Sequence, residues 1–99
     1  MSEISTREGA ARADALIARV ESLRRERPAE AWRELARGFA AAARGATPAQ
    51  HGALWRLRGH VLRALQRMRP ATEAYRRAER RYAAAGDVRE QGRCAIGLV

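Results

Sequence analysis

The chain has 99 residues and a formal net charge of +9, and all twenty of its basic residues are arginine. A chain of this length forms one domain that buries roughly two-thirds of the surface of the unfolded chain. It has no run of about 18 apolar residues, which excludes a transmembrane helix, and the opening MSEISTREGA lacks the apolar stretch of a secretory signal. The single cysteine, Cys94, excludes an internal disulfide. We therefore expect a cytoplasmic protein.

The positive charge points to three classes of partner: nucleic acid, an anionic membrane or an acidic protein. The arginines are scattered along the whole chain and form no basic tail, so most of them are expected to solvate helix faces. Where a binding site exists, arginine would favour bidentate pairing with carboxylates or phosphates.

The first predicted helix covers about residues 7–25. Its apolar residues recur at helical spacing and form one stripe, made of Ala13, Leu16, Ile17, Val20 and Leu23. Residues 1–6 are expected to be flexible, with Ser5 and Glu8 spaced as a capping box.

A second helix is predicted over about residues 29–43, after the helix-breaking Pro28. Its inward residues are Ala31, Trp32, Leu35, Phe39 and Ala42. Gly45 ends this helix. Thr47, a proline and then Gln50 form the start of the next helix, because threonine and glutamine at this spacing make a capping box.

The central part of the chain reads as two amphipathic helices separated by Arg69-Pro70. The apolar face of the first holds Leu54, Trp55, Leu57, Val61, Leu62, Leu65 and Met68. The second carries a narrower stripe of Ala71, Ala74, Tyr75, Ala78, Tyr82 and Ala85. Gly86 is suited to the left-handed conformation that closes a helix, and Asp87 is suited to cap the next one.

This central hairpin resembles a tetratricopeptide repeat (TPR). The matching residues are Trp55, Gly59 and Leu62 on the first helix and Ala71, Tyr75 and Ala78 on the second. Arg58 stands where the family has leucine, and the closing proline of the family is absent. Long repeats that end in Gly-Asp are similar to those of bacterial proteins that join such repeats to caspase-like (CHAT) peptidases or to large transcriptional regulators.

The resemblance implies an all-α fold of antiparallel helix hairpins, stacked as a short right-handed solenoid of about two repeats plus the first helix of a third. The expected units are a first hairpin at 7–45, which is a degenerate repeat or a cap, a TPR-like hairpin at 47–86 and a truncated repeat at 87–99. Aligning Ala31 with Ala71 brings the apolar positions of the two second helices into register, which supports the repeat.

Gly97 follows Gly59 at the spacing of a further repeat, so the last residues are expected to be its first helix. No second helix would then cover Ile96, Leu98 and Val99. Two explanations are open: the chain is a fragment of a larger bacterial regulatory or signalling protein, which we favour, or this end self-associates.

We find no catalytic, cofactor-binding or metal-binding motif. Cys94 and His60 deserve consideration as a nucleophile–base pair, since the repeat register places them on neighbouring first helices. No oxyanion site or orienting third group accompanies them. We therefore expect no enzyme activity and no cofactor.

The candidate partner-binding site is the groove that first helices line in this family. The resemblance places Arg56, His60 and Arg63 there, and the helical wheel independently puts these three residues on the polar face. A groove that prefers acidic peptide or protein segments is the hypothesis, and simple solvation of these side chains is the alternative.

Arg58 falls inside the apolar arc of its helix. A charge at such a position must meet a carboxylate, with Glu73 and Glu79 the nearest in sequence, or extend to solvent.

The favoured function is a non-catalytic scaffold for protein–protein interaction. An arginine-rich nucleic-acid-binding protein is the alternative, although no helix-turn-helix spacing or exposed aromatic platform supports it. No feature indicates membrane binding.

Overall fold

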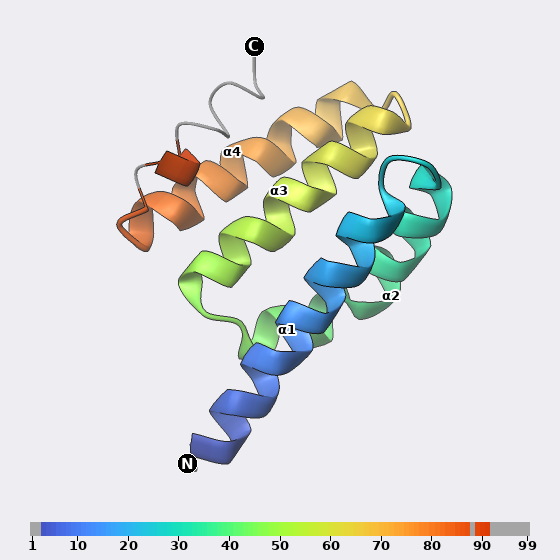
Figure 1. The fold of residues 1–99 in the computed structure, drawn as a ribbon. Helices are drawn as coiled ribbons and strands as arrows, with labels where there is room; N and C mark the ends of the chain where they lie inside the picture. The colour runs from blue at the N-terminus through green and yellow to red at the C-terminus, as the bar shows by residue number, and fades with distance from the viewer. Residues whose placement is uncertain (1–2, 88, 92–99) are drawn as a thin grey trace.

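The computed structural model describes residues 3–87 and 89–91 (Figure 1). Its helices are α1 (Glu3–Leu23), α2 (Pro28–Gly45), α3 (Pro48–Ala64) and α4 (Met68–Ala84). No strand occurs among the residues that the structure describes. The predicted all-α class is therefore confirmed.

The four helices form two hairpins that stack on each other. α1 packs along α2 and α3 packs along α4, while α3 also contacts both helices of the first hairpin. Figure 1 shows α3 lying between α4 and the first hairpin. Paired helices whose pairs stack in chain order are the arrangement of a helical-repeat fold.

The core consists of the apolar stripes that periodicity predicts. Its buried members are Ala13, Leu16 and Val20 of α1, Ala31, Leu35 and Ala42 of α2, Leu54, Leu57, Val61 and Leu62 of α3, and Ala71, Ala74, Tyr75, Ala78 and Tyr82 of α4. The buried positions of α2 and α4 follow the alignment of Ala31 with Ala71. Ala85 was predicted to lie on the α4 stripe, but it is exposed because the helix ends one residue earlier.

The two tyrosine rings of α4 pack directly on two glycines of α3. A Cβ added to Gly59 would lie 2.8 Å from the ring of Tyr75, and a Cβ added to Gly52 would lie 2.7 Å from the ring of Tyr82. Carbon atoms do not approach so closely, so a larger residue at either position would displace the ring. The spacing of seven residues on both helices sets one antiparallel register for this hairpin.

The first hairpin has the same kind of close approach. Gly9 of α1 and Gly45 of α2 meet backbone to backbone, and a Cβ on Gly9 would lie 2.6 Å from the Gly45 Cα. Seven residues further along α1, Leu16 packs over Gly38. Small residues therefore set the helix spacing in both hairpins.

The helix starts follow the sequence signals at α3 but not at α1. α1 begins at Glu3, so Ser5 lies in the first turn and is not the predicted N-cap. At α3, the Thr47 hydroxyl accepts a hydrogen bond from the Gln50 amide N–H at 3.2 Å, and the Gln50 side-chain oxygen accepts one from the Thr47 amide N–H at 2.9 Å. This confirms the predicted capping box.

The break between α3 and α4 lies earlier than Arg69-Pro70 predicted. α3 ends at Ala64 and α4 begins at Met68, so Pro70 is the third residue of α4. Proline is tolerated there because the first N–H groups of a helix have no intrahelical acceptor. Met68 was predicted to lie on the apolar face of the preceding helix. It belongs instead to α4 and is 56% exposed.

Both α3 and α4 end in a Schellman motif with a residue in the left-handed region. This residue is Gln66 (φ 61°) after α3 and Gly86 (φ 75°) after α4. The Gln66 amide donates to the Arg63 carbonyl at 2.9 Å, and the Gly86 amide donates to the Ala83 carbonyl at 3.1 Å. The predicted role of Gly86 is confirmed. Gln66 carries the strain of a side chain in this conformation, about 1–2 kcal/mol.

After α4, the Asp87 carboxylate accepts a hydrogen bond from the Glu90 amide N–H at 3.1 Å, as the predicted cap requires, and residues 89–91 are helical. The predicted self-association end, made of Ile96, Leu98 and Val99, lies outside the described residues, and so does Cys94. No described helix combines the length and the apolar character needed to cross a membrane.

Candidate partner-binding surface

Arg56, His60 and Arg63 lie along one side of α3, because spacings of four and three residues return to the same helix face. The C-terminal end of α1 lies close to them, since the charges of Arg24 and Glu21 act on the His60 ring. We call Arg24, Arg56, His60 and Arg63 together the α1–α3 surface.

His60 is half-buried and contacts α4. Its Nδ1 and the Tyr75 hydroxyl share a hydrogen bond of 2.7 Å, and the two rings meet edge to face at 5.4 Å between centroids. Tyr75 itself is 2% exposed. The predicted groove residue therefore also joins the surface to the core of its own hairpin.

The surface around His60 carries a net positive charge. Arg24 pairs with Glu21 and Arg56 pairs with Glu90, which leaves Arg63 as the arginine of this surface without an ion pair among the described residues. Burial and then the guanidinium groups of Arg24, Arg56 and Arg63 lower the pKa of His60 to about 4, and Glu21 opposes them only in part. The ring is therefore neutral at pH 7, and the positive charge of the surface comes from the arginines alone.

Arg56 is paired within the domain. Its Nε lies 3.8 Å from Oε2 of Glu90, and the two side chains are only 23% and 19% exposed. The carboxylate comes from the helical turn after α4, so Arg56 links α3 to the chain that follows the second hairpin. Arg56 is accordingly less accessible than the helical wheel suggested.

Arg63 is the most accessible of the three arginines of α3. It is exposed, its guanidinium carbon lies 5.7 Å from the centroid of the Tyr75 ring, and it forms no ion pair with any residue that the structure describes. A cation held over an aromatic face keeps its donors free for an incoming anion.

Arg58 meets neither of its predicted carboxylates. Its guanidinium carbon lies 5.1 Å from the centroids of both Trp32 and Phe39 and 5.3 Å from that of Trp55. Phe39 and Trp55 pack edge to face at 4.9 Å. The three rings come from α2 and α3, so the charge is accommodated by cation–π contacts between the two hairpins.

A second guanidinium approaches one of these rings, that of Trp55, from α4. The guanidinium carbon of Arg77 lies 4.9 Å from the Trp55 centroid, and its Nη2 lies 3.4 Å from Oε1 of Glu73. Burial lowers the pKa of Arg58, and the charge of Arg77 lowers it further. We call Arg58, Arg77 and the three rings of Trp32, Phe39 and Trp55 the arginine–aromatic cluster.

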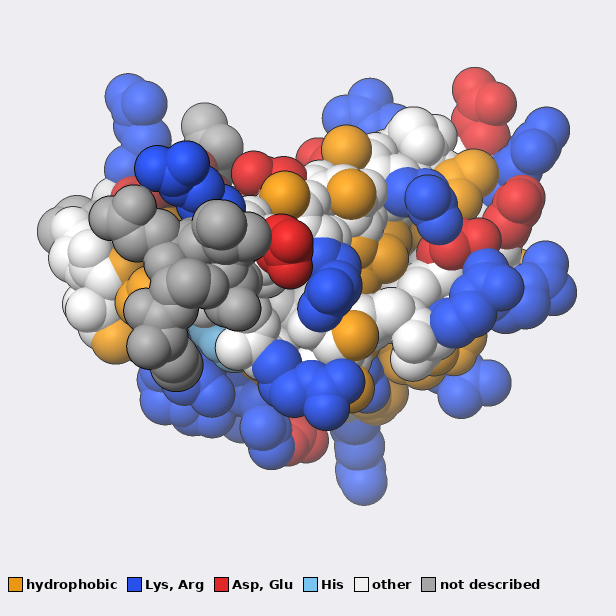
Figure 2. Space-filling view, turned by 90° about the horizontal axis from the view of Figure 1, so that it is seen from below, with side chains coloured by type: hydrophobic (Ala, Val, Ile, Leu, Met, Phe, Trp, Pro, Cys, Tyr) orange, Lys and Arg blue, Asp and Glu red, His pale blue; other side chains and the backbone are white. Residues whose placement is uncertain are grey.

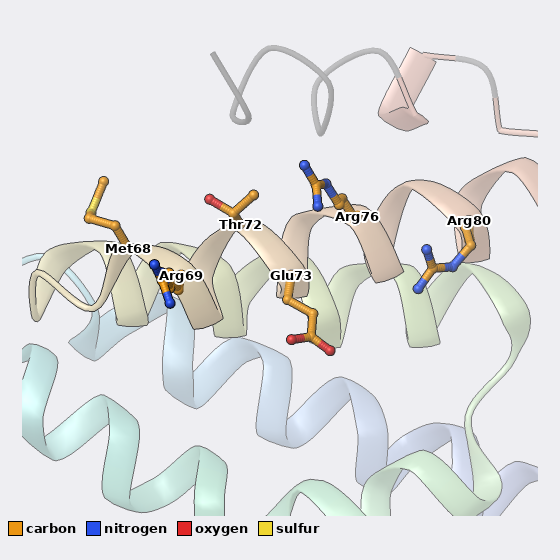
Figure 3. A pocket seen from close by; sticks show the side chains of 6 residues that line it. All are labelled: Met68, Arg69, Thr72, Glu73, Arg76 and Arg80. Carbon is orange, nitrogen blue, oxygen red and sulfur yellow. The ribbon is translucent and has the colours of Figure 1, made fainter.

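The outer side of α4 forms a hollow of about 570 Å³. The described residues that line it are Met68, Arg69, Thr72, Glu73, Arg76 and Arg80, which all come from this one helix (Figure 3). These side chains are polar or charged apart from Met68. They do not converge on a common point in Figure 3, so we assign no site to this hollow.

The arginines are dispersed over the molecule. On the face shown in Figure 2 arginines lie both along the edge and in the middle, some of them side by side along the lower edge, and hydrophobic and acidic side chains lie between the others. Dispersion of this kind agrees with a solvating role for most of the arginines.

The described residues form no group of three or more His, Cys, Asp or Glu side chains that could hold a metal ion. Of the considered nucleophile–base pair, His60 is hydrogen-bonded to Tyr75, and Cys94 lies outside the described residues.

Sequence reasoning missed one member of the surface, Arg24, and the ion-pair partner of another, Glu90. The charge of Arg24 acts on His60 from the turn after α1, and Glu90 pairs with Arg56 from beyond α4. Both contacts depend on tertiary packing, for which no local pattern exists.

Comparison of the chain with protein-family models, with curated proteins and with solved structures found no match.

Proposed function

We propose that this chain is a non-catalytic, tetratricopeptide-like scaffold that binds an acidic segment of a partner protein through the α1–α3 surface. One observation carries the proposal: the positive charges of Arg24, just after α1, and of Arg56 and Arg63 on α3 all act on the neutral ring of His60, and Arg63 has no ion pair with any described residue. Guanidinium groups pair bidentately with carboxylates, and a positive surface steers negative partners towards it.

The architecture supports this use of the surface. α1 and α3 are the first helices of their hairpins and lie in contact with each other. In the family that the central hairpin resembles, first helices line the ligand-binding side. The proposed setting is a bacterial regulatory or signalling assembly in the cytoplasm, as the likeness of the second hairpin to long bacterial repeats suggests.

A nucleic-acid partner is less favoured by the geometry. Three arginines would neutralise about three phosphates, which predicts a slope of only about −2.7 in log K against log salt on duplex DNA. Stacking on single-stranded bases needs aromatic faces, and Trp32 and Trp55 belong to the arginine–aromatic cluster, away from the three arginines.

The test uses a labelled ten-residue peptide of alternating Glu and Gly and the same peptide with Gln in place of Glu. The double variant Arg56→Glu, Arg63→Glu is compared with Arg76→Glu, Arg80→Glu, which makes the same change of charge on the outer side of α4 (Figure 3). We expect the first variant to bind the Glu peptide at least about tenfold more weakly than the second, with equal helix content by circular dichroism.

Equal weakening in both variants would assign the binding to overall charge and would refute the α1–α3 surface. Equal binding of the Gln peptide would remove the preference for acidic segments. Tighter binding to a DNA duplex than to the Glu peptide, at the same salt concentration, would replace the proposal by the nucleic-acid alternative.

A further inference from the structure

The arginine–aromatic cluster lies on the opposite side of α3 from the α1–α3 surface. Arg58 follows Arg56 by two residues, which turns the helix by about 200°. Trp32 and Phe39 approach from α2 and Arg77 approaches from α4, so the second helices of both hairpins flank the cluster. Any ligand here would therefore be separate from the one proposed above.

The charge of Arg58 lies among three aromatic rings. Three ring centroids lie within 5.3 Å of its guanidinium carbon, and no described residue forms an ion pair with it. The rings hold the planar group in place while its N–H donors stay available, which is the preorganised state that favours binding of an anion.

The local charges are unbalanced. Arg58 and Arg77 both lie over the Trp55 ring, at 5.3 and 4.9 Å from its centroid. Glu73 pairs with Arg77, and its side chain is 68% exposed. One carboxylate therefore balances two guanidinium groups, and one further negative charge would neutralise the cluster.

A small hollow of about 210 Å³ opens beside these charges. Its apolar lining is made of Trp55, Leu62, Pro70 and Ala74. Arg58 and Arg77 also line this hollow. Pockets for drug-sized ligands begin at about 300 Å³, so this one suits a single apolar side chain better than a cofactor.

We propose that this hollow binds a partner peptide segment in which a single carboxylate stands next to an apolar side chain. The apolar side chain enters between Trp55, Leu62 and Ala74, and the carboxylate pairs with Arg58 and Arg77 at the rim. Charge complementarity selects the carboxylate, and the size and lining of the hollow select its neighbour.

Glu73, which also lines the hollow, limits how much negative charge the bound segment can carry. The first carboxylate of an acidic run would neutralise the cluster. Each further carboxylate would then lie near the negative charge of Glu73 and be repelled by it. The site is therefore expected to prefer one Glu-Leu step in a neutral background over an acidic run, which is the reverse of the preference expected for the α1–α3 surface.

The tryptophan signals of the chain can report ligand binding at this site. The chain contains two tryptophans, Trp32 and Trp55, and both belong to the cluster. The two indole N–H signals in a nitrogen–proton NMR spectrum of the full chain therefore follow ligand binding here. The probes are ten-residue Gly/Ser peptides that contain one Glu-Leu, one Gln-Leu or one Glu-Ser step, and a peptide of alternating Glu and Gly.

We expect saturable shifts of the indole signals with the Glu-Leu peptide and at least about tenfold weaker binding of the other three probes. Arg58→Met keeps an unbranched apolar stem against the rings and removes the charge, and it should weaken Glu-Leu binding about tenfold or more. Arg69→Met, an exposed change on α4, is the matched control and should bind as the wild type does. If Arg58→Met does not fold, Arg77→Met, at an exposed position, gives the same test.

Equal shifts with the Gln-Leu peptide would overturn the carboxylate assignment, and equal shifts with the Glu-Ser peptide would overturn the apolar one. Absence of indole shifts with every peptide would overturn the site. Displacement of the Glu-Leu peptide by millimolar inorganic phosphate, at constant ionic strength, would assign the cluster to phosphate. Each of these results leaves the α1–α3 surface untouched, because its test uses other variants and another readout.

Discussion

The half-buried His60 makes the stability of the domain depend on pH. In the folded domain, burial and the surrounding arginines lower the pKa of His60 from 6.5 to about 4. In the unfolded chain the ring returns to about 6.5. Between these two values the unfolded chain binds a proton that the folded domain does not, so the free energy of unfolding falls as the pH falls from about 6.5 towards about 4. Above 6.5 neither state is protonated and the ring contributes no pH dependence.

The size of the effect follows from the two pKa values. The difference between 6.5 and about 4 corresponds to at most about 3 kcal/mol if it were felt in full. The ring is only half-buried, and solvent screens its interaction with the arginines. We therefore expect a loss of about 1–2 kcal/mol from this residue between pH 7 and pH 4.

Urea unfolding at pH 7, 6, 5 and 4, followed by circular dichroism, measures this loss. His60→Gln should lose about 1–2 kcal/mol less than the wild type over this range. His51→Gln is the matched control, because it removes the other histidine and keeps His60. Burial and then the charge of Arg81 also lower the pKa of His51, so this variant should differ from the wild type in the same direction as His60→Gln but by less. Carboxylates titrate in all three proteins, so their contribution cancels in the comparison. The same pH dependence in His60→Gln and in the wild type, or an NMR titration that places His60 near pH 6.5, would refute the reasoning.

Three further changes test the packing and the helix ends by urea unfolding at pH 7. Gly59→Ala forces the Tyr75 ring away from α3, so overpacking of about 1–3 kcal/mol should exceed the helix-propensity gain of up to about 1 kcal/mol; unchanged or higher stability would contradict the close contact. Gln66→Gly relieves the left-handed strain and should stabilise by about 0.5 kcal/mol after the entropy of glycine is included, whereas Gly86→Ala should destabilise by about 1 kcal/mol; the same sign for both would exclude the two Schellman ends. Thr47→Ala removes the capping box and should cost about 1 kcal/mol, and no loss would show that the cap is not needed.

The second helix of the first hairpin and the start of α3 could be predicted because their signals are local. Pro28 and the Thr47 capping box act through the backbone of their own turn, and periodicity identifies the buried stripe of each helix. The end of α3 could not be predicted in the same way. Gln66 adopts a conformation that normally indicates glycine, so the first visible break was Pro70, which α4 tolerates in its first turn.

Only the part of the candidate site that lies on a single helix could be predicted from the sequence. Helix geometry places Arg56, His60 and Arg63 on one side of α3 without further information. The partners that give the surface its character, such as Arg24, come from other helices. Arg58 shows the same limit: the sequence indicates a buried charge that needs partners, but the aromatic rings that supply them meet only after the two hairpins have stacked.

The packing of Tyr75 on Gly59 and of Tyr82 on Gly52 restricts sliding of α4 along α3. A slide of α4 along α3 by one turn, about 5.4 Å, would lift Tyr75 and Tyr82 from Gly59 and Gly52 onto larger neighbours at the same moment. Shear within the hairpin is therefore opposed at two points two turns apart. If helices of this domain move relative to one another, we expect the motion at the contact between the hairpins and not within the second hairpin. Such a motion would change the distance between α1 and α3, while His60 and Tyr75, which belong to the same hairpin, would move together. The width of the α1–α3 surface would then vary without any change in how His60 is held on α4.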